Sequence, residues 1–219
     1  MGLKTKTKNP LEQRSYSFEV RAETTNEGDI IEGRPIVYNS LTDLGLFDEI
    51  IESGALTSTD LTDVRFLVNH DISKIPLARS RRNNGNSTMQ LTVDSDGMSI
   101  RVLLDTENNA DARSLYSAVQ RGDISGMSFM FSIDDEEWEN LESDHPTRRI
   151  KSIGSVVEVS AVTFPAYEAT EINARSQEAL ENARAALENA RSLCVPSVDT
   201  DEIELAKAKT KTLLMGGKK

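Results

Sequence analysis

The stretch GDISGMSFMF, residues 122–131, has the pattern of a glycine-containing turn that opens onto a β-strand. From Met127 onward, serine and methionine side chains alternate with phenylalanines, as expected for a strand with one face in the core. Ser128 would then project from a rigid strand beside a flexible turn. Because few other nucleophiles in the chain have a comparable setting, Ser128 is the first candidate for a functional residue.

The segments on either side of this stretch also favour β-structure, with turn-forming residues between short apolar runs. The candidate strands are 15–22, 29–38, 64–69, 87–93, 98–104, 127–133 and 155–164. One helix is predicted over 109–121, with Gly122 as its C-cap. The acidic and polar segment 134–149 contains Pro146 and is predicted to be a surface excursion without chemistry. The pattern predicts an α+β, mainly β protein built on a barrel or a sandwich.

The two ends of the chain differ from the part between them. Residues 1–14 begin with a basic stretch and are predicted to be disordered, and residues 15–172 form the main domain. Beyond it, the sequence ALENAR occurs twice at a spacing of seven residues, so 173–219 is predicted to be a helical appendage. Its narrow apolar stripe suits a coiled-coil seam, docking on a partner, or packing on its own domain.

Charge and composition exclude several classes of protein. The ends carry +3 and +2, so the remaining 190 residues carry −16 of the net charge of −11, which argues against specific nucleic-acid binding. The single Cys194 excludes an internal disulfide framework and a cysteine-rich zinc site. No apolar run approaches the roughly 18 residues of a membrane span, and no secretory signal is visible. We expect a soluble protein of a reducing compartment.

A serine nucleophile normally needs an imidazole to accept its proton, and the chain has only His70 and His145. His70 closes the apolar run 66–71, where a strand can hold its ring, whereas His145 lies in the polar segment 134–149. His70 is therefore the better base, although a histidine at a strand end is also common as a structural residue. One such histidine and scattered acids do not form a recognisable metal site.

An orienting carboxylate is the third requirement of this chemistry. Glu158 stands within the apolar run 155–162, and a carboxylate that points inward there needs a partner. An outward Glu158 on an edge strand is the alternative. Asp71 is a rival acid, but its neighbour His70 should point to the opposite face of the strand.

These residues resemble the prohead serine proteases of Hong Kong 97-like tailed phages, which are related in fold to the herpesvirus assemblins. The resemblance runs from about residue 18 to 174. Its motifs are EGRPIVY at 32–38, FDEII at 47–51 with SGAL at 53–56, FLVNHD at 66–71, DGM at 96–98, GDISGMSFMF at 122–131 and EVSAVTFPA at 158–166. The order and spacing of these motifs together make the resemblance specific.

The resemblance implies a closed or partly open assemblin-like β-barrel, surrounded by a few helices and followed by the helical appendage. It implies Ser128 as nucleophile, His70 as general base and then general acid, and Glu158 as the orienting acid. Arg79 follows Ala78 where the family usually shows Gly-Arg, and it would help the oxyanion through water. Met130 stands where the family often shows glycine, which predicts a bulkier wall near the nucleophile.

The function implied by the resemblance is that of a serine endopeptidase of phage capsid maturation. It would be made in the host cytoplasm and packaged inside the viral procapsid, where it cuts scaffold-like segments from the major capsid protein and finally removes its own appendage. No cofactor, metal, membrane or nucleic acid is expected, and a homodimer is left open. The alternative is a non-enzymatic scaffold or assembly protein that acts through its C-terminal helices.

Overall fold

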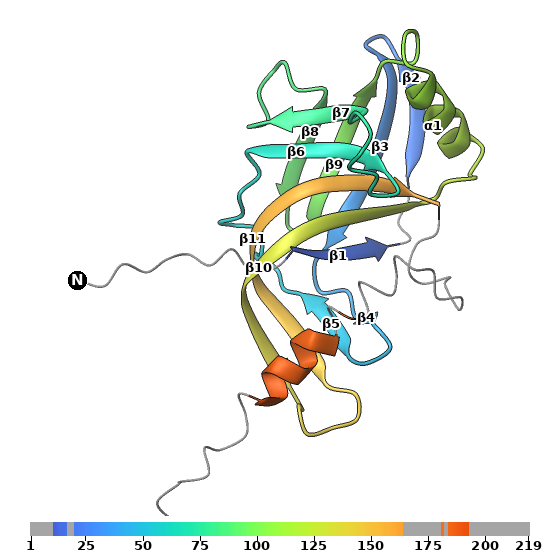
Figure 1. Cartoon of the computed structure of the whole chain (residues 1–219). Helices are drawn as coiled ribbons and strands as arrows, with labels where there is room; N and C mark the ends of the chain where they lie inside the picture. Colours follow the sequence, from blue (N-terminus) through green and yellow to red (C-terminus); the bar gives the residue numbers. More distant parts are fainter. Residues whose placement is uncertain (1–10, 17–19, 164–180, 182–183, 193–219) are drawn as a thin grey trace, which may run out of the picture. The chain divides into compact units, whose positions relative to one another are not determined.

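A computed structural model describes residues 11–16, 20–163, 181 and 184–192 (Figure 1). The chain forms two units, Met1–Arg184 and Ala185–Lys219. In the second unit, the described residues are helical up to residue 192, within the predicted appendage. None of the described helices is long and apolar enough to cross a membrane.

The first unit consists mainly of strands. They are β1 (Leu11–Tyr16), β2 (Arg21–Thr25), β3 (Gly28–Val37), β4 (Thr42–Asp43), β5 (Asp48–Ile51), β6 (Asp63–Val68), β7 (Ala78–Arg81), β8 (Met89–Asp94), β9 (Gly97–Leu104), β10 (Gly126–Glu139) and β11 (Thr147–Val162). Helix α1 (Ala110–Gln120) lies between β9 and β10 in the chain. The mainly β class predicted from the sequence is confirmed.

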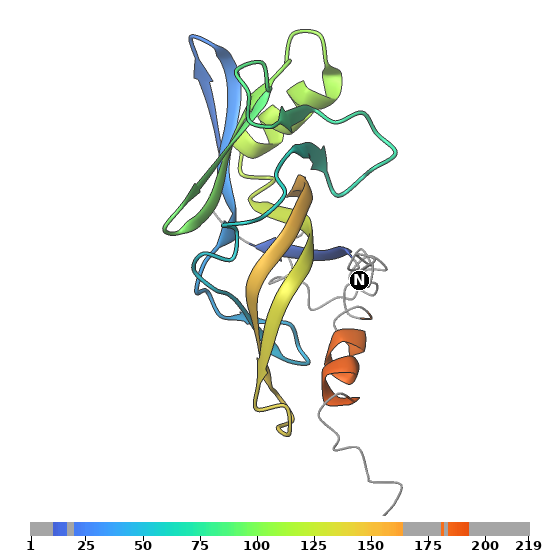
Figure 2. The ribbon, with the colours of Figure 1, turned by 90° about the vertical axis from the view of Figure 1, so that its left-hand side faces the viewer.

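The strands form two sheets. The seven-stranded sheet has the order β1-β10-β11-β5-β4, with β6 paired to β11 and β7 paired to β6. The other sheet has the order β2-β3-β9-β8, and Figure 2 shows it standing beside the ribbon of β10 and β11. Both sheets are open in the part of the chain that the structure describes. The closed form of the expected β-barrel is therefore not observed, and the partly open form stays a prediction.

The core collects apolar side chains from both sheets and from α1. Phe129 and Phe131 of β10 belong to it and are fully buried. Because neighbouring strand residues point to opposite faces, Ser128 and Met130 lie on the other face of the seven-stranded sheet. Ser128 pairs with Ser160 of β11 in the antiparallel register, so these two side chains share that face.

Helix α1 begins and ends where the sequence predicts. The side chain of Asn109 accepts hydrogen bonds from the first-turn amides of Asp111 and Ala112, which satisfies two donors that the helix itself leaves unpaired. Gly122 follows the helix with a φ of +78°, in the left-handed region that suits a glycine after a C-cap. The chain then enters β10 at Gly126, and Ser128 is the third residue of this strand.

Three short strands, β4, β5 and β7, are absent from the sequence prediction, and residues 11–14 belong to β1 instead of a disordered N-terminus. The prediction of a surface excursion over 134–149 is also wrong in part, because β10 continues to Glu139 and β11 begins at Thr147. Acids of β10 face basic residues of β11. Arg149 Nε lies 2.6 Å from Glu139 Oε1, and such opposite charges stabilise a strand pair that composition alone assigns to a loop.

Two motifs of the resemblance are structural. Arg34 makes a two-pronged ion pair with Asp94, at 2.6 and 2.8 Å, and this hydrogen bonding lowers the pKa of Asp94. At the β8–β9 turn, Gly97 has a φ of +137°, and a Cβ there would stand 2.0 Å from the carbonyl oxygen of Ile36. The sequence therefore needs glycine at 97 for the fold rather than for chemistry.

Candidate active site

The end of β6 turns sharply and directs a histidine towards β11. Asn69 and His70 both have left-handed backbones, with φ of 52° and 57°. This conformation is uncommon outside glycine, although Asn and His adopt it more readily than most residues. Asn69 fixes the turn because its side chain donates to Thr163 Oγ1 at 3.0 Å and accepts from Thr163 N–H at 3.0 Å. The His70 amide donates to Ser160 Oγ at 3.1 Å.

The imidazole of His70 contacts a buried carboxylate. Its Nδ1 lies 2.5 Å from Glu158 Oε1, and Glu158 is only 2% exposed. The second carboxylate oxygen, Oε2, accepts a hydrogen bond from Ser160 Oγ at 2.6 Å. A buried carboxylate with these partners holds the Nδ1–H tautomer and leaves Nε2 as the basic nitrogen. Glu158 therefore points inward, as the first of the two sequence readings expects.

The other ring nitrogen has no such partner. His70 Nε2 is buried, and it has no hydrogen-bond partner among the residues that the structure describes. Buried polar atoms are normally paired, so an unpaired one in a catalytic-type setting points to a functional role. The neighbouring face of the sheet carries Ser160 and, opposite it on β10, Ser128.

Ser128 lies on this face but does not bond to the histidine. It is 0% exposed, and its Oγ donates a hydrogen bond to the carbonyl oxygen of Arg14 in β1 at 2.7 Å. Strand β1 pairs antiparallel with β10 and places Ser15 opposite Ser128. The structure thus brings His70 and Glu158 into contact, and places Ser128 next to them on the same face with its proton directed at β1.

Comparison with known proteins places the chain in a family. A family model of the caudovirus prohead serine proteases matches residues 16–184. The chain belongs to this family. It is 30% identical over 179 residues to the prohead protease of Enterobacteria phage HK97, covering 78% of this chain and 72% of that protein. Among solved structures, it is similar to the bacteriophage T4 capsid assembly protease, with 10% identity, a TM-score of 0.39, and coverage of 71% and 99% of the two chains.

Family membership confirms the resemblance seen in the sequence and makes this chain a phage prohead serine protease. Two other candidates from the sequence of this prohead protease make side-chain hydrogen bonds to residues other than His70 and Ser128. Arg79 stands on β7, which β6 and β11 separate from β10, and its guanidinium binds both carboxylate oxygens of Asp63 at 2.5 and 2.6 Å. Asp71, the rival orienting acid, accepts at Oδ1 from the amide and hydroxyl of Ser73.

Sequence reasoning did not single out two residues of the site, Ser160 and Asn69. Ser160 follows Glu158 by two positions, so the period of a strand places both on one face, and this signal could have found it. Asn69 could have been noticed because asparagine adopts left-handed turns readily. The contact between Ser128 and Arg14 has no signal in the local sequence, because it depends on the pairing of β1 with β10.

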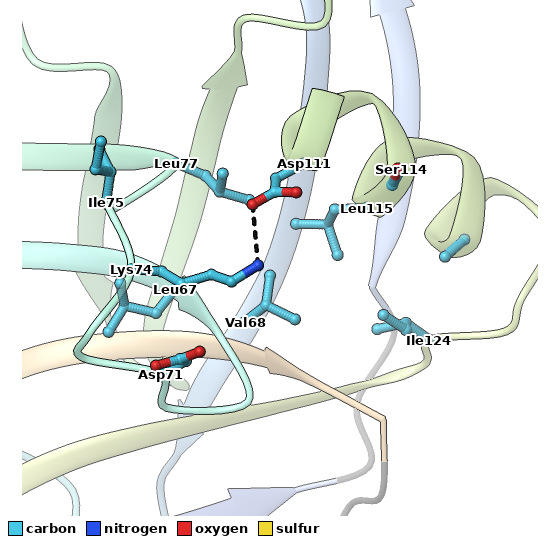
Figure 3. Close-up of a pocket in the computed structure, with 11 residues that line it drawn as sticks. Leu67, Val68, Asp71, Lys74, Ile75, Leu77, Asp111, Ser114, Leu115 and Ile124 are labelled. Atoms are coloured by element: carbon cyan, nitrogen blue, oxygen red, sulfur yellow. Dashed lines mark hydrogen bonds and ion pairs between the residues drawn. The ribbon is translucent and has the colours of Figure 1, made fainter. Parts of the chain in front are cut away.

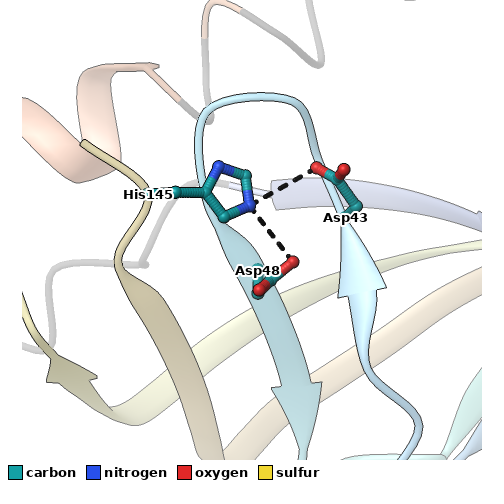
Figure 4. A group of neighbouring side chains, drawn as sticks. All are labelled: Asp43, Asp48 and His145. Atoms are coloured by element: carbon teal, nitrogen blue, oxygen red, sulfur yellow. Dashed lines mark hydrogen bonds and ion pairs between the residues drawn. The ribbon is translucent and has the colours of Figure 1, made fainter. Parts of the chain in front are cut away.

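The second histidine of the protease lies at the other end of β11 (Figure 4). His145 Nε2 is 3.2 Å from Asp48 Oδ1 and 3.6 Å from Asp43 Oδ1, and its side chain is 41% exposed. Asp48 pairs with Thr147, the first residue of β11, whereas Glu158 lies near the last. The three side chains form a surface ion-pair group, apart from the site around His70.

A pocket of about 310 Å³ adjoins the His70 turn (Figure 3). Its lining is mostly apolar and comes from β6, the loop before β7, α1 and the segment that enters β10. The lining includes Leu67, Val68, Ile75, Leu77, Leu115, Ala118 and Ile124. Lys74 and Asp111 face each other across it, 3.1 Å apart. The lining includes Val68, which precedes the turn at residues 69 and 70, and Asp71, which follows it. The pocket therefore borders the turn that carries His70.

Proposed function

We propose that this chain is a serine endopeptidase in which Ser128 is the nucleophile, His70 the general base and Glu158 the orienting acid. The observation that carries the proposal is the buried contact between Glu158 and His70 Nδ1, with an unpaired Nε2 on the face that holds Ser128. This is the arrangement that a serine–histidine–carboxylate triad requires, apart from the last hydrogen bond between serine and histidine.

The reaction is acyl transfer. Ser128 Oγ first turns from the Arg14 carbonyl towards Nε2 of His70, and then attacks the carbonyl carbon of a peptide bond while Nε2 accepts its proton. The tetrahedral intermediate collapses when the same nitrogen returns the proton to the leaving amine, and the acyl-enzyme forms. Water, deprotonated by His70, then attacks the acyl-enzyme and releases Ser128. Backbone amides are the expected donors to the oxyanion, and Arg79 has no part in this scheme because Asp63 engages it.

Ser160 has a supporting role in this mechanism. Its hydroxyl donates to Glu158 and accepts from the main chain of His70, so one fully buried side chain connects both members of the pair. Such a support keeps the ring and the carboxylate in a fixed geometry, and errors of about 1 Å in such geometry are costly to catalysis. Ser160 is therefore a positioning residue in the proposed site.

We infer the biological substrate from the family to which the chain belongs. We infer that the protease acts inside the procapsid, where it cuts scaffold-like segments of the major capsid protein and then its own chain beyond about residue 170. The name of the HK97 relative, a prohead protease, supports a role at this stage of assembly. The predicted boundary near residue 172 lies outside the described residues and is part of the proposal.

The apolar pocket beside the His70 turn is suited to a large aliphatic side chain of the substrate next to the cleaved bond. We expect the wild type to cleave peptides with Leu at that position about tenfold or more faster than peptides with Ala, since small differences in apolar fit have effects of this size. Ser114→Leu, an exposed change on the α1 face of the pocket, should bring the two rates close together. Cleavage profiles of a peptide library, read by mass spectrometry, measure this.

The control for that change is Gln120→Leu, which adds the same side chain to an exposed position of α1 outside the pocket lining. It should leave the profile unchanged. If both variants keep the wild-type cleavage profile, the pocket does not take part in substrate recognition. The triad proposal would be unaffected by that result.

Labelling with a fluorophosphonate, which reacts with activated serines, tests the proposed function directly. After long incubation of the full chain, peptide mapping should find the label on Ser128 and none on Ser132, which lies on the same strand and face but pairs with Ser155 at 3.0 Å. His70→Ala should abolish the label. Equal labelling of both serines, or a label that persists without His70, would contradict the proposal.

A further inference from the structure

We propose that β1 is an internal occupant of the active site, which covers Ser128 and keeps the protease latent until the strand leaves the edge of β10. This inference rests on the proposed function, because it assigns a regulator to the same serine. It concerns residues Leu11–Tyr16, which precede the rest of the domain in the chain and pair only with β10 among the described strands.

The first argument is the position of β1. Its register places Ser15 opposite Ser128, and the carbonyl oxygen of Arg14 accepts the Ser128 hydroxyl proton at 2.7 Å. A nucleophilic serine must instead have its oxygen against the carbonyl carbon of a substrate and its proton directed at the base. Ser128 is 0% exposed, so a substrate cannot reach its oxygen while β1 remains in place.

The second argument is the state of the base. His70 has its Nδ1 on Glu158, but its buried Nε2 has no hydrogen-bond partner in the described part of the chain. Ser128 and His70 therefore lie on the same face of the sheet, but no hydrogen bond joins the Ser128 hydroxyl to His70 Nε2. When β1 leaves, the Ser128 hydroxyl loses the Arg14 carbonyl as its acceptor and can rotate. His70 Nε2, which is unpaired, can then accept its hydrogen bond.

The third argument is how β1 is held. Arg14 binds Glu49 of β5 through Nε and Nη2, at 2.5 and 2.7 Å, and Glu12 binds Arg148 of β11 at 2.8 and 2.9 Å. All four side chains are buried. Burial alone would raise the pKa of Glu12, but Arg14 and Arg148 together hold it below its ordinary value, so the group is charged at neutral pH.

Anchoring by buried charges suits a strand that has to leave. When two paired ions separate into water, they regain their hydration, which offsets much of the electrostatic attraction that is lost. Apolar side chains that become exposed have no such compensation. The side chains of Glu12 and Arg14 thus specify where β1 docks without making its departure prohibitive. An extended peptide can pair with the vacated edge of β10 through its backbone, as peptides do at exposed sheet edges.

A reversible lock tests this inference in the full chain. Leu11 pairs with Ser132, so Leu11→Cys with Ser132→Cys, in a Cys194→Ser background, can tie β1 to β10 by a disulfide. We expect the oxidised chain to label at Ser128 with fluorophosphonate at least a hundredfold more slowly than the same chain after reduction. Because one molecule is compared before and after reduction, folding defects affect both states alike. Equal rates in the two states would overturn the inference.

A second variant acts in the opposite direction. Gln13→Pro fixes φ near −65° in the middle of β1, away from the extended geometry of a paired strand, so labelling of Ser128 should be at least tenfold faster than in the wild type. Thr92→Pro makes the same change in β8, which is at the edge of the other sheet, and should leave the rate unchanged. A wild type that labels as fast as Gln13→Pro would overturn latency but not the protease. No label at Ser128 in any chain would overturn both proposals.

Discussion

Ser128→Ala is expected to abolish self-cleavage, with a rate lowered by about 10⁶-fold, the size of loss seen when a triad nucleophile is removed. Alanine has no oxygen to form the acyl-enzyme, and His70 Nε2 has no hydrogen-bond partner among the described residues that could replace it. The measurement is mass spectrometry of the purified full chain during incubation. The wild type should lose the segment beyond about residue 170, and Ser128→Ala should keep its full mass.

Ser132→Ala is the matched control for this variant, because Ser132 lies four residues further along the same face of β10 and its hydroxyl hydrogen-bonds to Ser155. It should shorten like the wild type. Shortening of Ser128→Ala at the wild-type rate would remove Ser128 from the mechanism. Procapsid assembly with Ser128→Ala is the further comparison: if assembly continues without cleavage, the chain's enzymatic role is separate from any scaffold role of its C-terminal segment.

The β10 strand and helix α1 could be predicted because their signals are local. Alternating serine and phenylalanine define the first part of β10, and Asn109 with Gly122 define the ends of α1. The inward position of Glu158 could also be inferred, since an apolar strand is expected to bury it and a buried carboxylate needs a partner. The sequence left open the alternative that Glu158 points outward from an edge strand. Only the tertiary structure shows that β11 has neighbouring strands on both sides.

Long-range pairing explains what could not be predicted. From its composition, the acidic end of β10 is predicted to be a loop. In the structure it is a strand, because Arg148 and Arg149 of β11 lie opposite it. Strand β1 similarly depends on partners far along the chain, since Arg14 reaches Glu49 and its carbonyl meets Ser128. These contacts join residues separated by 35 and 114 positions, for which a single sequence offers no pattern.

Glu158→Gln is expected to lower kcat by about 10⁴-fold with little change in KM, as for a triad acid replaced by its amide. The amide keeps the shape of the side chain, so Ser160 can retain a hydrogen bond to its oxygen. However, its NH₂ group would face Nδ1 of His70, which favours the tautomer with the proton on Nε2. That tautomer cannot accept the proton of Ser128, and the imidazolium would also lose its counter-charge.

Glu137→Gln provides the comparison, because Glu137 is an exposed acid of β10 that pairs with Lys151 on the surface. It should cleave at the wild-type rate, and both variants should be compared for thermal unfolding. A kcat for Glu158→Gln within tenfold of the wild type would assign Glu158 a structural role and leave His70 to be oriented by its backbone bond to Ser160. A large loss in kcat with unchanged KM separates orientation of the base from binding of the substrate, because only the first acts in the transition state.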